Sequence, residues 1–263
     1  VNVTTGSITA DGESNITAGN DVNLNAGTVT ASGASNINAG NDVNVTTGSI
    51  TADGESNITA SNDVNLNAGT VTAGGASDIT AKGDVNVTTG SITAKGAGNI
   101  TAGNDVNLNA GTVAAGGASD INAGNDVNVT TGSITADGAS NITAGNDVNL
   151  NAGTVTASNI NAGDDVNVTT GSITADGAGN ITAGNNVNLN SSTLVFGADS
   201  VITATNGNIA LGNGSITVNG ANNGLTLDAN GSVMQDAAAK GITADNLTVE
   251  SGKTQQLLSK SNK

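Results

Sequence analysis

Cysteine, proline, histidine, tryptophan and tyrosine are absent from this sequence, and Phe196 is its only aromatic residue. Its six basic residues are all lysines. Without thiol, imidazole or guanidinium groups, the chain lacks most of the side chains that serve as nucleophiles, metal ligands or anion clamps. Carboxylates, hydroxyls, amides and a few amines are what remains for chemistry, and we expect no cofactor.

Basic charge is also scarce. The chain carries 22 acidic residues against six basic ones, a formal net charge of −16. Nucleic acids and anionic lipids need basic residues to neutralise phosphate, so we expect neither as a partner. We expect no membrane insertion and no signal peptide, because no apolar run is long enough and no charged segment precedes one. Since the sequence begins within its own pattern at Val1, we expect it to be a piece of a longer protein.

What the sequence does have is an internal repeat. Two variants alternate, one reading DVNVTTGSITADGESNITASN from Asp42 and the other DVNLNAGTVTASGASNINAGN from Asp21. A fixed period of this length is typical of a solenoid. The valine after the aspartate recurs every 21 residues, at Val22, Val43, Val64, Val85, Val106, Val127 and Val148.

Within one unit, apolar residues alternate with polar ones, which indicates strands. The unit from Asp42 predicts strands at Val43–Thr46, Ser49–Ala52 and Asn57–Ala60, separated by clusters of Gly, Asp, Asn and Ser that favour turns. A single coil of three strands buries too few apolar side chains to offset the ordering of its backbone. Coils must therefore stack, with equivalent residues about 4.8 Å apart.

The predicted fold is an all-β, right-handed parallel β-helix, a solenoid with about 21 residues and three short strands per coil. We favour the right-handed form because the hexapeptide periodicity common in left-handed β-helices is absent. The expected structural core includes Val22, Leu24, Val29, Ile37, Val43, Val45, Ile50, Ile58, Val64, Leu66, Val71 and Ile79.

The regularity of the repeat divides the chain into three parts. We expect a regular β-helix over residues 1–190, an irregular continuation over 191–252, and an end segment over 253–263 that is frayed, a cap or the start of another coil. From Val148 to Val166 the step is only 18 residues, so we expect a corner to shrink while the strands persist. Phe196 and Met234 are expected to fill the irregular core.

An aspartate before the first valine of each unit places a column of carboxylates on one corner. Hard cations such as Ca²⁺ take several oxygen ligands, so this column is a possible cation ladder. The favoured alternative is a solvated turn residue, since the GGxGxDxUx nonapeptide of Ca²⁺-binding β-rolls is absent. We therefore assign no metal site. The column consists of Asp21, Asp42, Asp63, Asp84, Asp105, Asp126, Asp147 and Asp165.

Two other surface patterns follow from the repeat. Outward threonines such as Thr46, Thr51 and Thr59 recur, as in ice-binding solenoids, but they are spread over all three faces and the first strand alternates Asn-Val-Thr with Asn-Leu-Asn. Asn-x-Thr triplets, which are formal glycosylation acceptors, recur as products of the same repeat. They begin at Asn2, Asn15, Asn44, Asn57, Asn86, Asn99, Asn128, Asn141, Asn167 and Asn180.

The segment Ala39–Val45 (AGNDVNV), followed by Gly48–Ala52 (GSITA), resembles the repeat regions of filamentous-haemagglutinin-like exoproteins, which are large bacterial adhesins exported by two-partner secretion. The resemblance covers about the first 190 residues, and the segment Ala229–Val249 is similar to the less regular repeats of that family. It implies a right-handed β-helix fibre that is secreted or held on the cell surface and contributes to virulence. It also implies a receptor on host cells or other bacteria and an outer-membrane transporter as partner.

Catalysis needs a localised, exceptional site, whereas each carboxylate of the repeats has near-identical copies one or two coils away. We therefore expect no enzyme activity but a structural and adhesive stalk segment that mediates or projects cell adhesion. One alternative is the stick of a contact-dependent toxin-delivery protein. Another, of a different class, is a ligand-binding solenoid that holds Ca²⁺ or binds ice.

Overall fold

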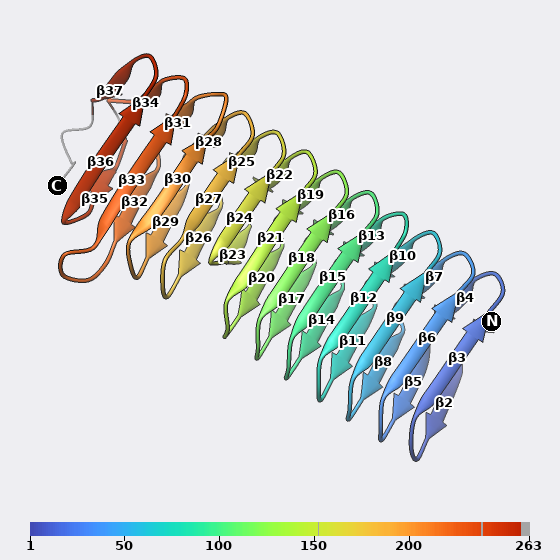
Figure 1. Cartoon of the computed structure of the whole chain (residues 1–263). Helices are drawn as coiled ribbons and strands as arrows, with labels where there is room; N and C mark the ends of the chain where they lie inside the picture. The colour runs from blue at the N-terminus through green and yellow to red at the C-terminus, as the bar shows by residue number, and fades with distance from the viewer. Residues whose placement is uncertain (152, 238, 259–263) are drawn as a thin grey trace. The chain divides into compact units, whose positions relative to one another are not determined.

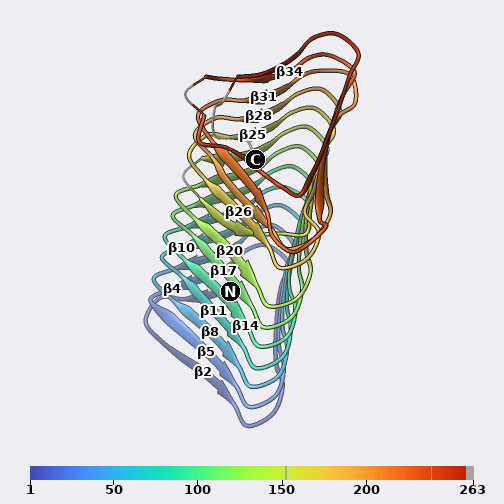
Figure 2. The ribbon, with the colours of Figure 1, turned by 90° about the vertical axis from the view of Figure 1, so that its left-hand side faces the viewer.

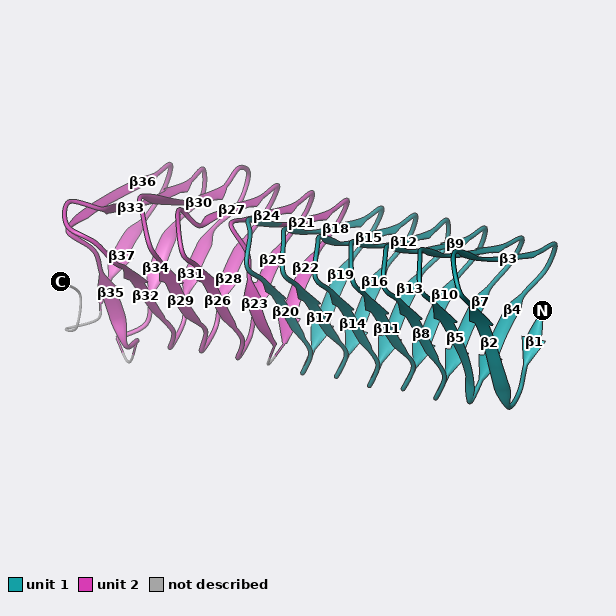
Figure 3. Ribbon diagram, turned by 90° about the horizontal axis from the view of Figure 1, so that it is seen from below, with its two compact units in different colours: residues 1–140 teal, residues 141–263 magenta. Residues whose placement is uncertain are grey.

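The computed structural model describes residues 1–151, 153–237 and 239–258. Every regular element in these ranges is a β-strand of two to six residues. The strands belong to two compact units, residues 1–140 and 141–263, coloured separately in Figure 3. We call them unit 1 and unit 2.

Unit 1 contains strands of three parallel sheets, which we call A, B and C. Sheet A has β1 (Asn2–Val3), β4 (Val22–Asn25), β7 (Val43–Thr46), β10 (Val64–Asn67), β13 (Val85–Thr88), β16 (Val106–Asn109) and β19 (Val127–Thr130). Sheet B has β2 (Gly6–Ala10), β5 (Gly27–Ala31), β8 (Ser49–Ala52), β11 (Thr70–Ala73), β14 (Ser91–Ala94), β17 (Thr112–Ala115) and β20 (Ser133–Ala136). Sheet C has β3 (Ser14–Ala18), β6 (Ser35–Ala39), β9 (Ser56–Ala60), β12 (Ser77–Ala81), β15 (Gly98–Ala102) and β18 (Ser119–Ala123).

The chain passes through A, B and C in turn and then returns to A, so that equivalent strands of successive coils lie side by side (Figure 1). Val64 pairs with Val43 on one side and with Val85 on the other, a register of one repeat per coil. The first two predicted strands are confirmed at β7 and β8, and the third, β9, begins one residue earlier at Ser56.

Alternation along each strand decides what lies inside the coil. In β7, Val43 and Val45 are buried while Asn44 is half-buried and Thr46 is exposed. The same pattern on all three sides encloses a narrow aliphatic interior. Figure 2 shows the backbone coils around it, with β2, β5 and β8 side by side. The twelve residues expected in the core are each 0–1% exposed.

A tight corner joins sheet A to sheet B. Thr47 has a φ of 55° and Ala68 a φ of 53°, in the left-handed region that costs a residue with a Cβ atom about 1–2 kcal/mol. Gly48 follows Thr47, and a Cβ added there would lie 2.7 Å from the carbonyl oxygen of Gly27 in the preceding coil. Glycine is required because the coils approach too closely for a side chain.

Unit 2 likewise contains strands of three parallel sheets, for which we keep the labels A, B and C. Sheet A has β22 (Val148–Asn151), β25 (Val166–Val168), β28 (Val187–Leu189), β31 (Ile209–Leu211), β34 (Val233–Gln235) and β37 (Gln255–Leu257). Sheet B has β23 (Thr154–Thr156), β26 (Ser172–Ala175), β29 (Thr193–Phe196), β32 (Ser215–Val218) and β35 (Gly241–Thr243). Sheet C has β21 (Ser140–Ala144), β24 (Asn159–Ala162), β27 (Asn180–Ala183), β30 (Ser200–Ala204), β33 (Gly224–Ala229) and β36 (Asn246–Ser251).

Corners absorb the variation in coil length within unit 2. Val148 pairs with Val166 across a step of 18 residues, and β23 and β24 both persist on either side of the shortened corner, as predicted. In later coils the spacing between equivalent residues increases to 22 residues, from Asn186 to Asn208, and to 24 residues, from Asn208 to Ser232. The predicted fold class, a parallel β-helix with about 21 residues and three short strands per coil, is confirmed.

Two residues, Phe196 and Met234, were predicted to fill the core of the irregular part, and only one of them is buried. Phe196 is fully buried in β29, as expected. Met234 is 43% exposed, so that prediction was wrong: Val233 and Gln235 take the inward positions of β34, and alternation turns Met234 outward. The division at residues 190 and 252 stays a prediction. Of the predicted end segment, residues 255–257 form β37, and residues 259–263 lie outside the described part.

Candidate functional site

The corner that precedes sheet A carries the column of aspartates, which we call the Asp corner (Asp21, Asp42, Asp63, Asp84, Asp105 and Asp126 in unit 1; Asp147 and Asp165 in unit 2). Its side chains are half-buried. Oδ1 of Asp63 accepts the backbone N–H of Asp84 at 2.8 Å, and Oδ1 of Asp42 accepts that of Asp63 at 3.1 Å. The backbone carbonyl of Asp63 accepts the N–H of Val43. Each aspartate therefore joins its coil to both neighbours.

The hydrogen bonds of the Asp corner do not require a negative charge in every coil. In unit 2, asparagines take the same place, and Oδ1 of Asn186 and of Asn208 accept the N–H groups of Asn208 and Ser232 at 3.0 and 2.9 Å. An amide oxygen thus serves as well as a carboxylate oxygen. Among the described residues, no group of three or more acidic side chains is arranged to hold a metal ion. The cation ladder stays a hypothesis.

A row of asparagine side chains runs along the outer face of sheet A in unit 1. Nδ2 of Asn65 donates to Oδ1 of Asn44, and Nδ2 of Asn86 donates to Oδ1 of Asn65, both at 2.9 Å. Each inner amide therefore donates to one coil and accepts from the next, and such chains of hydrogen bonds reinforce one another. The row contains Asn2, Asn23, Asn44, Asn65, Asn86, Asn107 and Asn128.

The asparagine rows include several of the Asn-x-Thr acceptors. Asn44 and Asn86 donate Nδ2 hydrogens within sheet A. In sheet C, Asn57 donates to Asn36 at 2.9 Å and Asn99 to Asp78 at 2.7 Å. A glycan on any of these nitrogens must fit a half-buried row whose members are about 4.8 Å apart. The ladder geometry therefore competes with glycosylation at these positions.

Threonines align most regularly on sheet B. Thr30, Thr51, Thr72 and Thr93 are paired in register across β5, β8, β11 and β14. Ala114 interrupts this column before it continues at Thr135. On sheet A the corresponding column alternates between threonine and asparagine, as Thr46 and Asn67 do. Ice binding stays a hypothesis.

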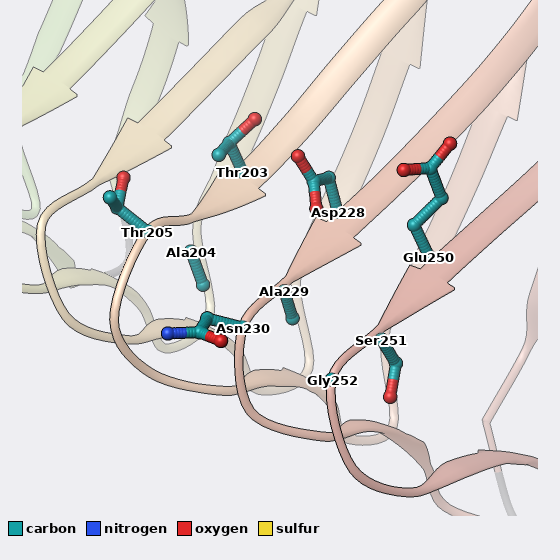
Figure 4. Close-up of a pocket in the computed structure, with 9 residues that line it drawn as sticks. All are labelled: Thr203, Ala204, Thr205, Asp228, Ala229, Asn230, Glu250, Ser251 and Gly252. Carbon is teal, nitrogen blue, oxygen red and sulfur yellow. The ribbon is translucent and has the colours of Figure 1, made fainter.

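An open hollow of about 440 Å³ lies at the ends of β30, β33 and β36 in unit 2 (Figure 4). Thr203, Asp228 and Glu250 occupy paired positions on the three strands, and their side chains stand in a row. Asn230, in the turn after β33, and Ser251, the last residue of β36, lie beside them. The two exposed carboxylates can accept hydrogen bonds from a ligand, and they repel one another across neighbouring strands.

The sequence analysis did not predict that Asp228 and Glu250 lie together. The two residues occupy the same position in the similar segments LTLDAN (225–230) and LTVESG (247–252), and this similarity could have indicated that they are neighbours. The segments lie where the repeat is irregular. Shallow hollows of similar size recur in unit 1, at about 370 Å³ beside Lys95 and Asp137 and at about 350 Å³ beside Asp78 and Asp120. Hollows like the one in unit 2 are therefore a common feature of the sheet faces.

No helix in the described ranges is long and apolar enough to cross a bilayer. No family model, curated protein or solved structure matches the chain. Its function has to be inferred from the stacked coils and from the resemblance carried by residues 39–52.

Proposed function

We propose that this chain is a structural and adhesive stalk segment of a large bacterial protein that is secreted or held at the cell surface, and that it is not an enzyme. The observation that carries the proposal is the equivalence of successive coils. In unit 1 the same inward side chains, asparagine row and Asp corner recur at every repeat. Such a stack can be lengthened coil by coil without a new kind of contact, which is what a spacer requires.

The hydrogen bonds of the stack support a mechanical role. Backbone pairing, the asparagine row and the Asp corner all join one coil to the next, and bonds also cross the corners, as from Gly54 N–H to Gly33 O at 3.0 Å. Tension applied at the two ends of the chain is therefore carried by many parallel bonds per coil. A coil that yields releases roughly 70 Å, because 21 residues extend by 3.3–3.6 Å each.

Adhesion is the second part of the proposal. Outward rows of similar polar side chains repeated along the stack offer many weak contacts, which together bind more tightly than one alone. The resemblance of residues 39–52 to filamentous-haemagglutinin-like repeats supports a receptor on host cells or other bacteria, and export through an outer-membrane transporter.

Force spectroscopy tests the stalk role. The chain is tethered at its two ends and pulled, and we expect a series of steps of roughly 70 Å or whole multiples of it. The matched variant lacks residues 43–84, one complete pair of repeat variants, so that Asp42 is followed by Val85 in place of Val43. It should fold and lose about 140 Å of total extension. A deletion variant that does not fold, or a release unrelated to coil length, would contradict the stalk.

Bead adhesion tests the second part separately. Beads coated with the full chain should bind host epithelial or bacterial cells more strongly than beads carrying the 43–84 deletion at equal density, because fewer coils offer fewer contacts. Beads coated with albumin provide the baseline. Binding at the albumin level by the full chain would refute adhesion while leaving the mechanical role intact.

A further inference from the structure

Ser192 stands where the preceding coils of unit 2 have glycine. The residue that leads into sheet B is Gly153, then Gly171, then Ser192, then Gly214, as the hydrogen bonds from the following residues show. Ser191 has a φ of 56°, the same left-handed turn seen at Thr47. One coil therefore keeps the tight corner but adds a hydroxymethyl group to its inner side.

The Ser192 side chain is 1% exposed, and its Oγ has no hydrogen-bond partner among the described residues. A buried hydroxyl without a partner is destabilising, and most such groups in proteins are satisfied by the protein or by ordered water. A Cβ added at Gly214 would lie 3.0 Å from this Oγ. The hydroxyl therefore lies close to the bare α-carbon of Gly214 in the next coil.

A small cavity lies at the same place. It has about 10 Å³ of space open to the centre of a water molecule, and Leu189, Ser192, Leu211, Gly214 and Gln235 are among its lining residues. That space admits a water molecule, and it is too small for a larger ligand. The described lining residues include no charged side chain, and Gln235 among them is 4% exposed.

We propose that this cavity binds one internal water, which bonds to Ser192 Oγ and to the polar groups around Gln235. A hydroxyl can donate and accept, and an amide side chain offers both functions, so a water has the two or more partners that it needs. The water joins the coil of Ser192 to that of Gln235, with the coil of Leu211 and Gly214 between them, at the point where the regular repeat gives way to longer corners.

Two matched substitutions test the proposal. Ser56 in β9 is also buried with an unpartnered Oγ, so Ser56→Ala removes only an unsatisfied hydroxyl and should raise Tm by roughly 2 °C or more. Ser192→Ala should instead lower Tm, because the water loses an anchor. A rise in Tm for Ser192→Ala like that for Ser56→Ala would overturn the proposal.

A crystal structure of the wild-type chain provides the direct measurement. We expect one ordered water within hydrogen-bonding distance of Ser192 Oγ, and its loss in Ser192→Ala. An empty cavity, or an Oγ turned onto a backbone carbonyl, would refute the site even if both Tm shifts had the expected sign.

Discussion

Gly48→Ala should disrupt the stack at the corner between sheets A and B. The new Cβ would lie 2.7 Å from the carbonyl oxygen of Gly27 and 2.8 Å from that of Leu24, closer than real Cβ atoms come to such groups. Both obstacles are backbone atoms, so the coil itself must move, and overpacking of this kind costs about 1–3 kcal/mol. The same shift strains the bond from Thr70 N–H to Gly48 O, worth about 1 kcal/mol. We expect a net loss of about 2–3 kcal/mol.

Gly177→Ala is the control. It lies in the corner between sheets B and C, above the coil that is three residues shorter, and a Cβ there meets no atom within 4 Å. It should therefore stabilise the chain by about 0.4–1 kcal/mol through the entropy of the unfolded state. Urea unfolding followed by circular dichroism measures both variants. Equal stability of Gly48→Ala and the wild-type chain, or an equal loss in both variants, would refute the close approach of the coils.

Three other substitutions test the ladders and the corner. Asn65→Ala removes a side-chain bond on each side of the asparagine row and should cost about 1–3 kcal/mol in urea unfolding; no change would show that the row is not stabilising. Thr47→Asn should raise Tm, with a gain of about 0.5–1 kcal/mol, because asparagine tolerates the left-handed turn better; a fall in Tm would contradict this. Asp63→Asn keeps the oxygen that accepts the Asp84 N–H, so its Tm should equal or exceed that of the wild-type chain. A saturable rise in wild-type Tm with added Ca²⁺ that is weakened in Asp63→Asn would instead establish the cation ladder.

The repeat alone was enough to predict how unit 1 is built. A strand has a side-chain period of two, so a slip of one residue between coils would turn every buried valine or isoleucine outward. Only the register of one repeat per coil places Val43 over Val22 and under Val64. The strand positions, the inward residues and the shrinking corner after Val148 all followed from that constraint.

The irregular part was less predictable for the same reason. With no fixed period, the lengths of the corners decide which residues of a strand point inward, and corner lengths are not readable from alternation alone. Met234 was misassigned because its hydrophobicity suggested an inward place that Val233 and Gln235 occupy. The inward positions of Val233 and Gln235, and not the hydrophobicity of Met234, determine that the Met234 side chain points outward.

Sequence by itself determined the architecture, because a strict period of alternating residues can bury its aliphatic side chains only by stacking coil on coil. Tertiary structure decided the chemistry of the surface and of the corners. Whether the Asp63 carboxylate accepts a backbone N–H, whether Asp228 stands beside Glu250, and whether Ser192 meets a cavity depend on atoms brought together from different coils. Such contacts depend on positions to within a few tenths of an ångström, which the packing of one coil on the next sets and local sequence does not.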